Sequence, residues 1–233
     1  MLYKSFFNIL IDLMKIKEKF PGVYLIDGKI ATINLSRGKK VYNEDLVEED
    51  DVEYRFWNPY RSKLSAAILN GLKNMQISES SSVLYLGAAT GTTVSHVSDI
   101  VKSKGRVYAI ELSERNVRNL LELCEVRKNI MPILSDARDV ENYEDVIEKC
   151  DFIYQDISAR NQAEILLLNS EIFLKKGGLA YFIIKSQSID ISKRPKDVYK
   201  EELAQFEGKF ELVESISLEP YDSMHLFAVL KKL

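Results

Sequence analysis

The sequence is poor in cysteine and carries little net charge. Its two cysteines, Cys124 and Cys150, cannot build a disulfide framework, which favours a reducing compartment, and both are expected to be small buried side chains. The 32 basic and 35 acidic residues leave a formal net charge of -3, so any contact with nucleic acid must come from a local patch or a partner. With 46% hydrophobic and 29% charged residues, the 233-residue chain can form one substantial globular domain and a small second unit.

The chain also lacks a long uninterrupted hydrophobic run. Residues 1–16 are rich in Leu, Ile, Met and Phe, but Lys4, Asp12 and Lys15 interrupt them, and no small-residue cleavage site follows. This stretch is too short and too charged to span a bilayer. Its apolar residues fall near one face of a helix, which predicts an amphipathic N-terminal extension over residues 1–19 that packs on this protein or on a partner. We therefore expect no membrane association and no targeting signal.

Residues 20–61 have the pattern of a small antiparallel β domain. Short strands are expected at residues 22–26, 30–34, 40–42 and 53–57. Asp27-Gly28 stands between the first two, and Asp-Gly in that position is a strong hairpin signal. The acidic run at 48–51 is expected to be a solvated loop. A helical pattern over residues 62–75 then leads into the larger domain.

A loop of small residues in the larger domain indicates an adenosine-containing cofactor. An apolar strand ends in Gly87-Ala88-Ala89-Thr90-Gly91, whose glycines let the backbone pass close to a ligand. Glu111 ends the next strand about 20 residues later, and Asp136 ends the third, so both acids are placed to contact a nucleoside. Alanines replace part of the three-glycine dinucleotide loop, which favours S-adenosylmethionine (SAM) over NAD without excluding NAD. By itself, the loop could also be an ordinary β–α turn.

Strands and helices alternate through residues 62–233. The expected strands are residues 83–87, 106–112, 129–136, 150–157, 179–185, 210–218 and 225–230. Such alternation builds a parallel sheet with helices on both faces. The last two strands are joined only by Glu219 to Met224, too few residues for a crossover, so this pair must be antiparallel. We predict an α/β, Rossmann-like fold of the class I SAM-dependent methyltransferase type, with a mostly parallel seven-stranded sheet and a C-terminal antiparallel hairpin.

Four ordered segments resemble the fibrillarin family in its archaeal form. They are Phe20-Pro-Gly-Val-Tyr24, the Tyr54–Leu64 segment YRFWNPYRSKL, the Tyr85–Asp99 segment YLGAATGTTVSHVSD, and Leu218-Glu-Pro-Tyr221. The resemblance runs from about Phe20 to the C-terminus. It implies methyl transfer from SAM to a ribose 2′-hydroxyl in rRNA and tRNA processing, in the cytoplasm of an archaeal cell. It also implies that a C/D-box guide RNA selects the target RNA within a particle that contains a Nop-domain scaffold protein and an L7-type kink-turn-binding protein.

The chain departs from the family pattern in three places. The Gly/Arg-rich tail of eukaryotic fibrillarins is absent. Residues 1–16 exceed the usual archaeal start and are either a real extension or a misassigned start codon. The family's Asp-Val-Ala-Gln after the fourth strand reads Asp156-Ile157-Ser158-Ala159 here, so the Asp is kept and the contact of the Gln is not carried over.

The resemblance implies a cofactor site, a catalytic set and no metal. The implied cofactor-binding residues are Gly87, Ala88, Thr92, Thr93, Glu111, Leu112, Asp136, Ala137, Asp156, Ile157, Ser158 and Ala159. The implied catalytic residues are Lys63, Asp156, Lys185 and His225. Without the resemblance, Lys63 would be read as a surface residue and His225 as a structural one. An ordinary lysine pKa lies near 10.4, and a neighbouring carboxylate favours the charged form further. Lys185 is therefore expected to stabilise a developing alkoxide as a cation, unless burial turns it into a base.

RNA contacts and alternative functions follow from the same residues. A modest basic rim is expected from Arg55, Arg61, Lys63, Arg160, Lys193, Arg194 and Lys196, although each could be an ordinary solvated charge. Three other functions stay open: an NAD-dependent oxidoreductase, a small-molecule methyltransferase, and a non-catalytic assembly protein. The small β unit argues against the second. The presence of all four catalytic candidates argues against the third.

Overall fold

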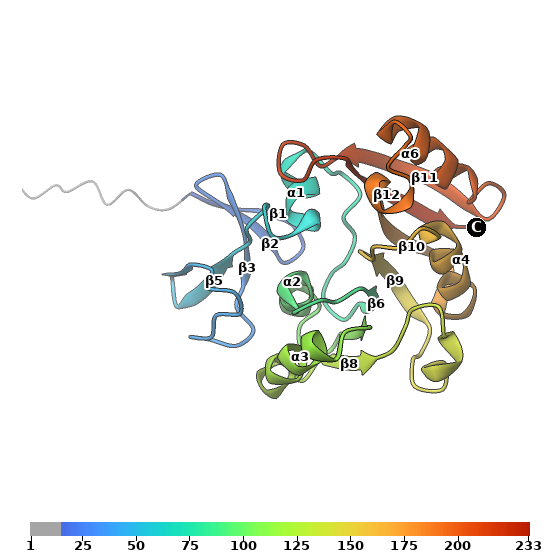
Figure 1. The fold of residues 1–233 in the computed structure, drawn as a ribbon. Coiled ribbons are helices and arrows are strands. Elements are labelled where there is room, and N and C mark those ends of the chain that lie inside the picture. The colour runs from blue at the N-terminus through green and yellow to red at the C-terminus, as the bar shows by residue number, and fades with distance from the viewer. Residues whose placement is uncertain (1–14) are drawn as a thin grey trace, which may run out of the picture.

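The computed structural model describes residues 15–233, in which a five-stranded antiparallel sheet precedes a seven-stranded mixed sheet (Figure 1). Most of the predicted N-terminal helix would fall on residues 1–14, outside the described part. No helix among residues 15–233 is long and apolar enough to cross a membrane.

The small sheet has the strand order β1-β2-β3-β5-β4. Its strands are β1 (Ile16–Phe20), β2 (Val23–Ile26), β3 (Lys29–Ile33), β4 (Leu46–Glu49) and β5 (Val52–Phe56). The predicted hairpin at Asp27-Gly28 is confirmed, and both residues have positive φ, 48° and 81°, as a two-residue type I′ turn requires. Ile16 pairs with Ile26, so residues 16–19 belong to this sheet and not to a helical extension as predicted. Residues 16–19 are extended because their backbone pairs with β2.

Two predictions within this domain are wrong. Residues 40–42 form no strand, because the backbone N–H groups of Val41 and Tyr42 donate to the carboxylate of Glu44 instead of to a neighbouring strand. The acidic run 48–51 is not a loop throughout. Its first half ends β4, and only Asp50 and Asp51 form the turn to β5, both with positive φ.

The large sheet confirms the predicted topology. Its order is β11-β12-β10-β9-β6-β7-β8, with β10, β9, β6, β7 and β8 parallel and with β12 antiparallel to both of its neighbours. The strands are β6 (Ser82–Leu86), β7 (Arg106–Glu111), β8 (Ile130–Leu134), β9 (Cys150–Gln155), β10 (Leu174–Lys185), β11 (Phe210–Ser217) and β12 (His225–Lys232). The helices are α1 (Lys63–Leu69), α2 (Thr92–Val101), α3 (Glu114–Val126), α4 (Gln162–Phe173), α5 (Ser186–Ile189) and α6 (Pro195–Ala204), with a short 3-10 turn, η1 (Val140–Asn142).

Helix α1 is shorter than the predicted 62–75. It ends before Asn70-Gly71, where Gly71 has a φ of 100° that most side chains rarely adopt. The side-chain amide of Asn70 donates to the carbonyls of Ser217 and Glu219, which ties the end of α1 to the β11–β12 hairpin.

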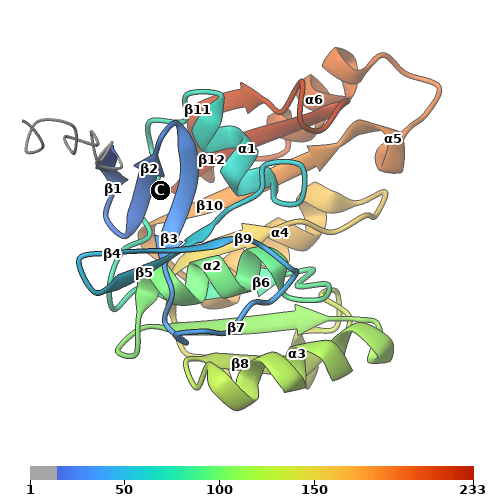
Figure 2. The ribbon, with the colours of Figure 1, turned by 90° about the vertical axis from the view of Figure 1, so that its left-hand side faces the viewer.

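Alternate residues along each strand of the large sheet pack into two separate cores. On one face, residues such as Tyr85, Ala109 and Tyr181 pack with α1, α2, α3 and the small β domain. On the other face, residues such as Leu84, Ile110 and Phe182 pack with α4 and α6. Figure 2 shows the small domain beside α1 and α2, on the first of these faces. A strand period of two thus buries both sides of the sheet.

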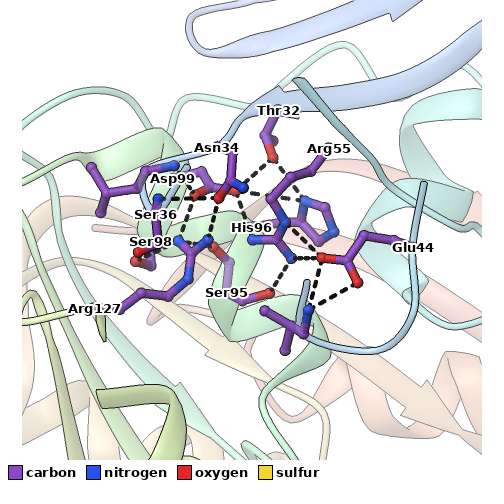
Figure 3. Close-up of polar contacts among 12 residues, drawn as sticks. Thr32, Asn34, Ser36, Glu44, Arg55, Ser95, His96, Ser98, Asp99 and Arg127 are labelled. Carbon is purple, nitrogen blue, oxygen red and sulfur yellow. Dashed lines mark hydrogen bonds and ion pairs between the residues drawn. The ribbon is translucent and has the colours of Figure 1, made fainter. Parts of the chain in front are cut away.

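A buried polar network joins the two domains (Figure 3). Arg55 of β5 is fully buried, and its guanidinium donates to Asp99 at 2.9 Å, to Ser95 at 2.9 Å and to Glu44 at 2.8 Å. Arg127, at the end of α3, donates to the other oxygen of Asp99 at 2.5 Å. The prediction that Arg55 belongs to an exposed RNA-binding rim is therefore wrong, because acceptors from distant segments surround it.

The chain reverses its direction of travel across the large sheet between β6 and β9. From β6 it proceeds to β7 and β8 on one side, and from β9 to β10 on the other. Open α/β sheets bind ligands at the carboxyl ends of the strands beside such a reversal. The loop after β6 and the segment after β9 lie at this point.

Candidate active site

A cavity of about 610 Å³ opens at the carboxyl ends of β6, β7, β8 and β9. Its volume lies within the usual range for small-molecule sites. Among the predicted cofactor residues, its lining includes Gly87, Glu111, Leu112, Asp136, Ala137, Asp156, Ile157, Ser158 and Ala159. Three others lie outside the lining: Ala88, Thr92 and Thr93.

Gly87 is held between β6 and the segment after β9. A Cβ at this position would lie 2.7 Å from Cγ2 of Ile157 and 2.8 Å from the carbonyl oxygen of Asp156, and the φ of Gly87 is 85°. A larger residue would have to push the two loops apart. The glycine therefore fixes the floor of the cavity.

Glu111 closes one wall of the cavity at the end of β7. One carboxylate oxygen accepts from the N–H of Ala89 at 2.8 Å, and the other accepts from the N–H of Ser113 at 2.9 Å and from the amide of Asn116 at 3.2 Å. These bonds fix the carboxylate while leaving acceptor capacity for ribose hydroxyls. The strand-end position predicted from the sequence is confirmed.

Asp136 is engaged by a neighbour that the sequence analysis did not single out. Arg138 donates to its two oxygens from Nε at 3.0 Å and from a terminal nitrogen at 2.5 Å, and the backbone N–H of Arg138 adds a third bond at 2.9 Å. The hydrogen bond from Arg138 is the main reason that the pKa of Asp136 lies below its ordinary value. The Asp-x-Arg spacing was the signal available in the sequence.

The predicted cofactor residues outside the cavity have structural partners. Ala88 is buried, and its N–H donates to the carbonyl of Ile110. Thr92 and Thr93 begin α2, and the Thr93 hydroxyl donates to the hydroxyl of Ser62 at 2.9 Å. Ser62 is also the N-cap of α1, so this bond links the start of α2 to the helix whose first residue is Lys63.

The four predicted catalytic residues lie near one another, at the end of the cavity that Asp156 and Lys185 line. Oδ1 of Asp156, a buried atom, lies 2.7 Å from Nζ of Lys185 and 3.2 Å from Nζ of Lys63. Lys185 also donates to the carbonyl of Asp156 at 2.9 Å and to the hydroxyl of Ser158 at 3.2 Å. Three acceptors around one nitrogen are what an ammonium group requires. In the β10–β12 ladder, Lys185 lies directly opposite His225.

Asp222 connects His225 to this group and was missed from the sequence. Its Oδ1 lies 2.6 Å from Nδ1 of His225, and its Oδ2 lies 3.5 Å from Nζ of Lys63. Burial opposes the charge of Lys63, but the carboxylates of Asp156 and Asp222 outweigh it and raise the Lys63 pKa. An acid three residues before a histidine was the available signal, but the turn between β11 and β12 has no regular period that would predict contact. We call these five residues, Lys63, Asp156, Lys185, Asp222 and His225, the charged cluster.

The cavity fits the parts of SAM. Glu111 can accept bonds from ribose hydroxyls, and Ile110, Leu112 and Ile157 give apolar walls. Asp156 and Lys185 line the cavity and also belong to the charged cluster. A group transferred from a cofactor in the cavity to an acceptor at this end would therefore pass next to acidic and basic side chains.

Sequence relatives are similar over nearly the whole chain. A family model described as Fibrillarin matches residues 14–232. The protein named "Fibrillarin-like rRNA/tRNA 2'-O-methyltransferase" from Pyrococcus abyssi is 48% identical over 221 residues, which cover 93% of this chain and 97% of its own. The protein of the same name from Methanocaldococcus jannaschii is 48% identical over 222 residues, covering 93% and 96%.

Solved structures give the same assignment. The Methanococcus jannaschii fibrillarin pre-rRNA processing protein superposes with a TM-score of 0.91 at 47% identity, covering 94% of this chain and 97% of the other. Aeropyrum pernix fibrillarin, solved with natively bound S-adenosyl-L-methionine, gives 0.85 at 39% identity, covering 93% and 99%. Fibrillarin in a fibrillarin/Nop5p complex gives 0.86 at 42% identity, covering 93% and 100%. These matches confirm the resemblance of the sequence motifs: the chain belongs to the fibrillarin family.

Proposed function

We propose that the chain transfers a methyl group from SAM to a ribose 2′-hydroxyl of rRNA and tRNA. The observation that carries this proposal is the position of Asp156 and Lys185, which belong both to the cofactor cavity and to the charged cluster. A methyl donor in the cavity and a hydroxyl at the cluster would meet there. The activity in the names of the relatives supports the same reaction.

The proposed roles of the residues follow from their charges and positions. SAM supplies an activated methyl group on a sulfonium sulfur when it is bound. Glu111 would hold the ribose of the cofactor, and Asp136 with Ala137 would meet the adenine. Lys63 and Lys185 bring positive charge to the place where negative charge develops on the ribose oxygen. Holding that oxygen in line with the methyl carbon accounts for much of the acceleration.

We infer that the chain works within a ribonucleoprotein and not alone. Its net charge is -3, and three residues of the predicted basic rim are engaged elsewhere, because Arg55 is buried and Lys193 and Arg194 pair with Glu201 and Asp197. These contacts weaken the rim as a surface that attracts RNA. A related fibrillarin was solved in complex with Nop5p, which supports a Nop-domain scaffold as the partner here. A C/D-box guide RNA would select the target, an L7-type protein would bind its kink-turn, and the particle would act in the cytoplasm of an archaeal cell.

Reconstitution tests this function. The chain, a Nop-domain protein, an L7-type protein and a guide RNA are combined with target RNA and labelled SAM. Methylation of one 2′-hydroxyl is expected, and a guide of altered sequence should move it to the newly paired nucleotide. A particle that assembles and binds SAM but methylates no ribose would identify an assembly protein instead. Methylation of a small molecule by the free chain would indicate a different substrate class.

A further inference from the structure

Asp222 lies between two of the predicted catalytic residues, Lys63 and His225. It belongs to the turn that joins β11 to β12, and its backbone N–H donates to the carbonyl of Leu218, which fixes the turn. One carboxylate oxygen lies 2.6 Å from Nδ1 of His225 and the other 3.5 Å from Nζ of Lys63. No motif or comparison reported above gives Asp222 a role.

The contact with Asp222 determines which nitrogen of His225 carries the proton. Nδ1 is hidden from solvent and forms no hydrogen bond of regular geometry, and the carboxylate oxygen of Asp222 lies 2.6 Å from it. An N···O contact of this length is repulsive without a hydrogen between the atoms, so we infer that the hydrogen lies on Nδ1. Neutral His225 then keeps a free lone pair on Nε2. Since Nδ1 is hidden, the exposed 22% of the side chain comes from its remaining atoms, which include Nε2.

Asp222 keeps its negative charge in the folded protein. Burial raises the pKa of its carboxyl group, but the hydrogen bond and charge of His225, together with the charge of Lys63, outweigh burial and leave that pKa below its ordinary value. The carboxylate can therefore accept a hydrogen bond from Nδ1–H and stabilise a positive charge that forms on the ring.

The charged cluster contains one group with a free lone pair on nitrogen. Lys63 and Lys185 both contact the carboxylate of Asp156, and an ammonium group donates hydrogen bonds but cannot accept a proton. His225 faces the same place, because it lies opposite Lys185 in the β10–β12 ladder. Among the charged groups, Asp222 contacts His225 directly, Lys63 contacts Asp222, and Lys185 is the Cα partner of His225 in the ladder. His225 is therefore the member of the cluster that is equipped to take a proton.

We propose that Asp222 is a positioning residue that fixes the proton of His225 on Nδ1, so that Nε2 accepts the proton of the ribose 2′-hydroxyl. The 2′-oxygen forms its bond to the methyl carbon as the carbon–sulfur bond breaks, the sulfur keeps that electron pair, and the hydroxyl proton goes to Nε2. The positive charge lost at sulfur reappears on the imidazolium beside Asp222. This inference rests on the proposed 2′-hydroxyl substrate.

The tautomer can be measured on the free protein without RNA. The chain has only two histidines, so the ¹⁵N spectrum of histidine-labelled protein contains two imidazoles, and His225→Gln assigns them. The spectrum is recorded with SAM present, at a pH well above the ordinary range of histidine. His225 is expected as the Nδ1–H form, and Asp222→Asn should shift it toward Nε2–H, because an amide can donate to Nδ1. An Nε2–H form in the unchanged protein would overturn the proposal.

Methyl transfer provides the second readout. In the reconstituted particle, Asp222→Asn should lower the single-turnover rate by about 100-fold or more with SAM affinity unchanged, and Asp222→Glu should recover part of the rate. Glu219→Gln, an exposed acid on the same turn, is the matched control and should leave the rate unchanged. Full activity in Asp222→Asn would overturn the proposal. If the unchanged particle transfers no methyl group, the proposed function fails, whereas the tautomer measurement still stands.

Discussion

Arg55 of the small β domain and Asp99 of α2 form an ion pair of 2.9 Å in which neither side chain is exposed. Arg127 contacts the same carboxylate from α3, and Glu44 contacts Arg55 from the loop before β4. The pair therefore joins the two domains through charges removed from water. Such charges are costly unless every one is paired, so the position of the small domain against α2 is strongly specified.

Removing Arg55 should destabilise the whole protein. Arg55→Leu leaves Glu44 without its ion-pair partner and deprives Asp99 of one of two, and breaking a buried pair costs about 3–5 kcal/mol. Urea unfolding followed by circular dichroism measures the loss. The control is Arg37→Ala, which removes the exposed ion pair with Glu48 and should change stability by about 1 kcal/mol or less. Equal effects of the two substitutions would mean that the buried pair contributes no more than a surface pair.

Stability should fall as the pH falls below about 6.5 because of His96. Burial, followed by the charges of Arg55 and Arg127, lowers the His96 pKa well below its ordinary value of 6.5. The unfolded chain binds a proton below that value and the folded chain does not. The stabilisation is therefore fully present above the His96 pKa of the unfolded chain. It is lost as the pH falls from that value toward the lower His96 pKa of the folded protein. From about pH 7 to about pH 5.5 the loss should be about 1 kcal/mol.

The other histidine provides the control for this pH dependence. In His225→Gln, the fall in unfolding free energy over the same pH range should remain, whereas in His96→Gln it should disappear. His96 bonds to Thr32 and Tyr42 and stacks on Trp57, so His96→Gln will also be less stable at every pH. The test is therefore the slope of the unfolding free energy with pH, not its absolute value. If this slope persists in His96→Gln, the pH dependence comes from other groups.

Glu111 should be needed for SAM binding. At about 100 times its Kd, a ligand that binds only the folded state adds about 2.7 kcal/mol of stability, which a thermal shift detects. Glu111→Ala should remove most of this shift, because both the acceptor for the ribose and the anchor of Ala89 are lost. Glu114→Ala, an exposed acid on the following helix, should retain the shift. A shift with NAD and none with SAM would contradict the cofactor assignment.

The sequence could predict the residues that follow regular elements. Glu111 ends an apolar strand, and Asp136 and Asp156 follow two more, so the alternation of strands and helices is enough to bring all three to one edge of the sheet. The Asp27-Gly28 hairpin could also be predicted from neighbouring residues alone. The strand ends depend on short-range periodicity and the hairpin on turn chemistry, and both signals lie within a few residues of the feature.

The sequence could not predict residues whose partners are distant in the chain. Arg55 stands among aromatic residues on a strand and gives no sign of burial, because its acceptors come from Glu44, Ser95 and Asp99. Asp222 meets His225 and Lys63 only through the folding of an irregular turn, and the β10–β12 register sets His225 opposite Lys185. Such contacts depend on tertiary packing, which no local pattern encodes.

The isolated chain should bind RNA weakly and show little site-specific methyl transfer. Besides the negative net charge, Lys193 and Arg194 of the predicted basic rim are paired with acids. Filter binding of target RNA at moderate salt should give weak affinity with a shallow salt dependence. Adding the Nop-domain protein, the L7-type protein and guide RNA should switch activity on at one nucleotide per guide. Strong sequence-selective methylation by the chain alone would contradict this dependence on partners.

Replacing Asp156 or Lys185 by alanine should abolish methyl transfer and leave particle assembly intact. Both residues follow or end strands at the junction of the cavity and the charged cluster, and neither contributes to the hydrophobic cores. Gel filtration of the reconstituted particle checks assembly, and labelled SAM checks transfer. Full activity in Lys185→Ala would remove this lysine from the mechanism.

Lys185→Arg distinguishes an electrostatic role from that of a base. Nζ of Lys185 has three acceptors within hydrogen-bond distance, which suits a charged ammonium. If that charge stabilises the developing alkoxide, Lys185→Arg should keep part of the activity, since a guanidinium keeps its charge and cannot act as a base in proteins. An active Lys185→Arg variant therefore excludes a lysine base. Arginine differs from lysine in shape, so an inactive variant is compared with Lys63→Arg. Activity in Lys63→Arg together with none in Lys185→Arg would indicate that Lys185 has to release a proton, and would transfer to it the role assigned here to His225.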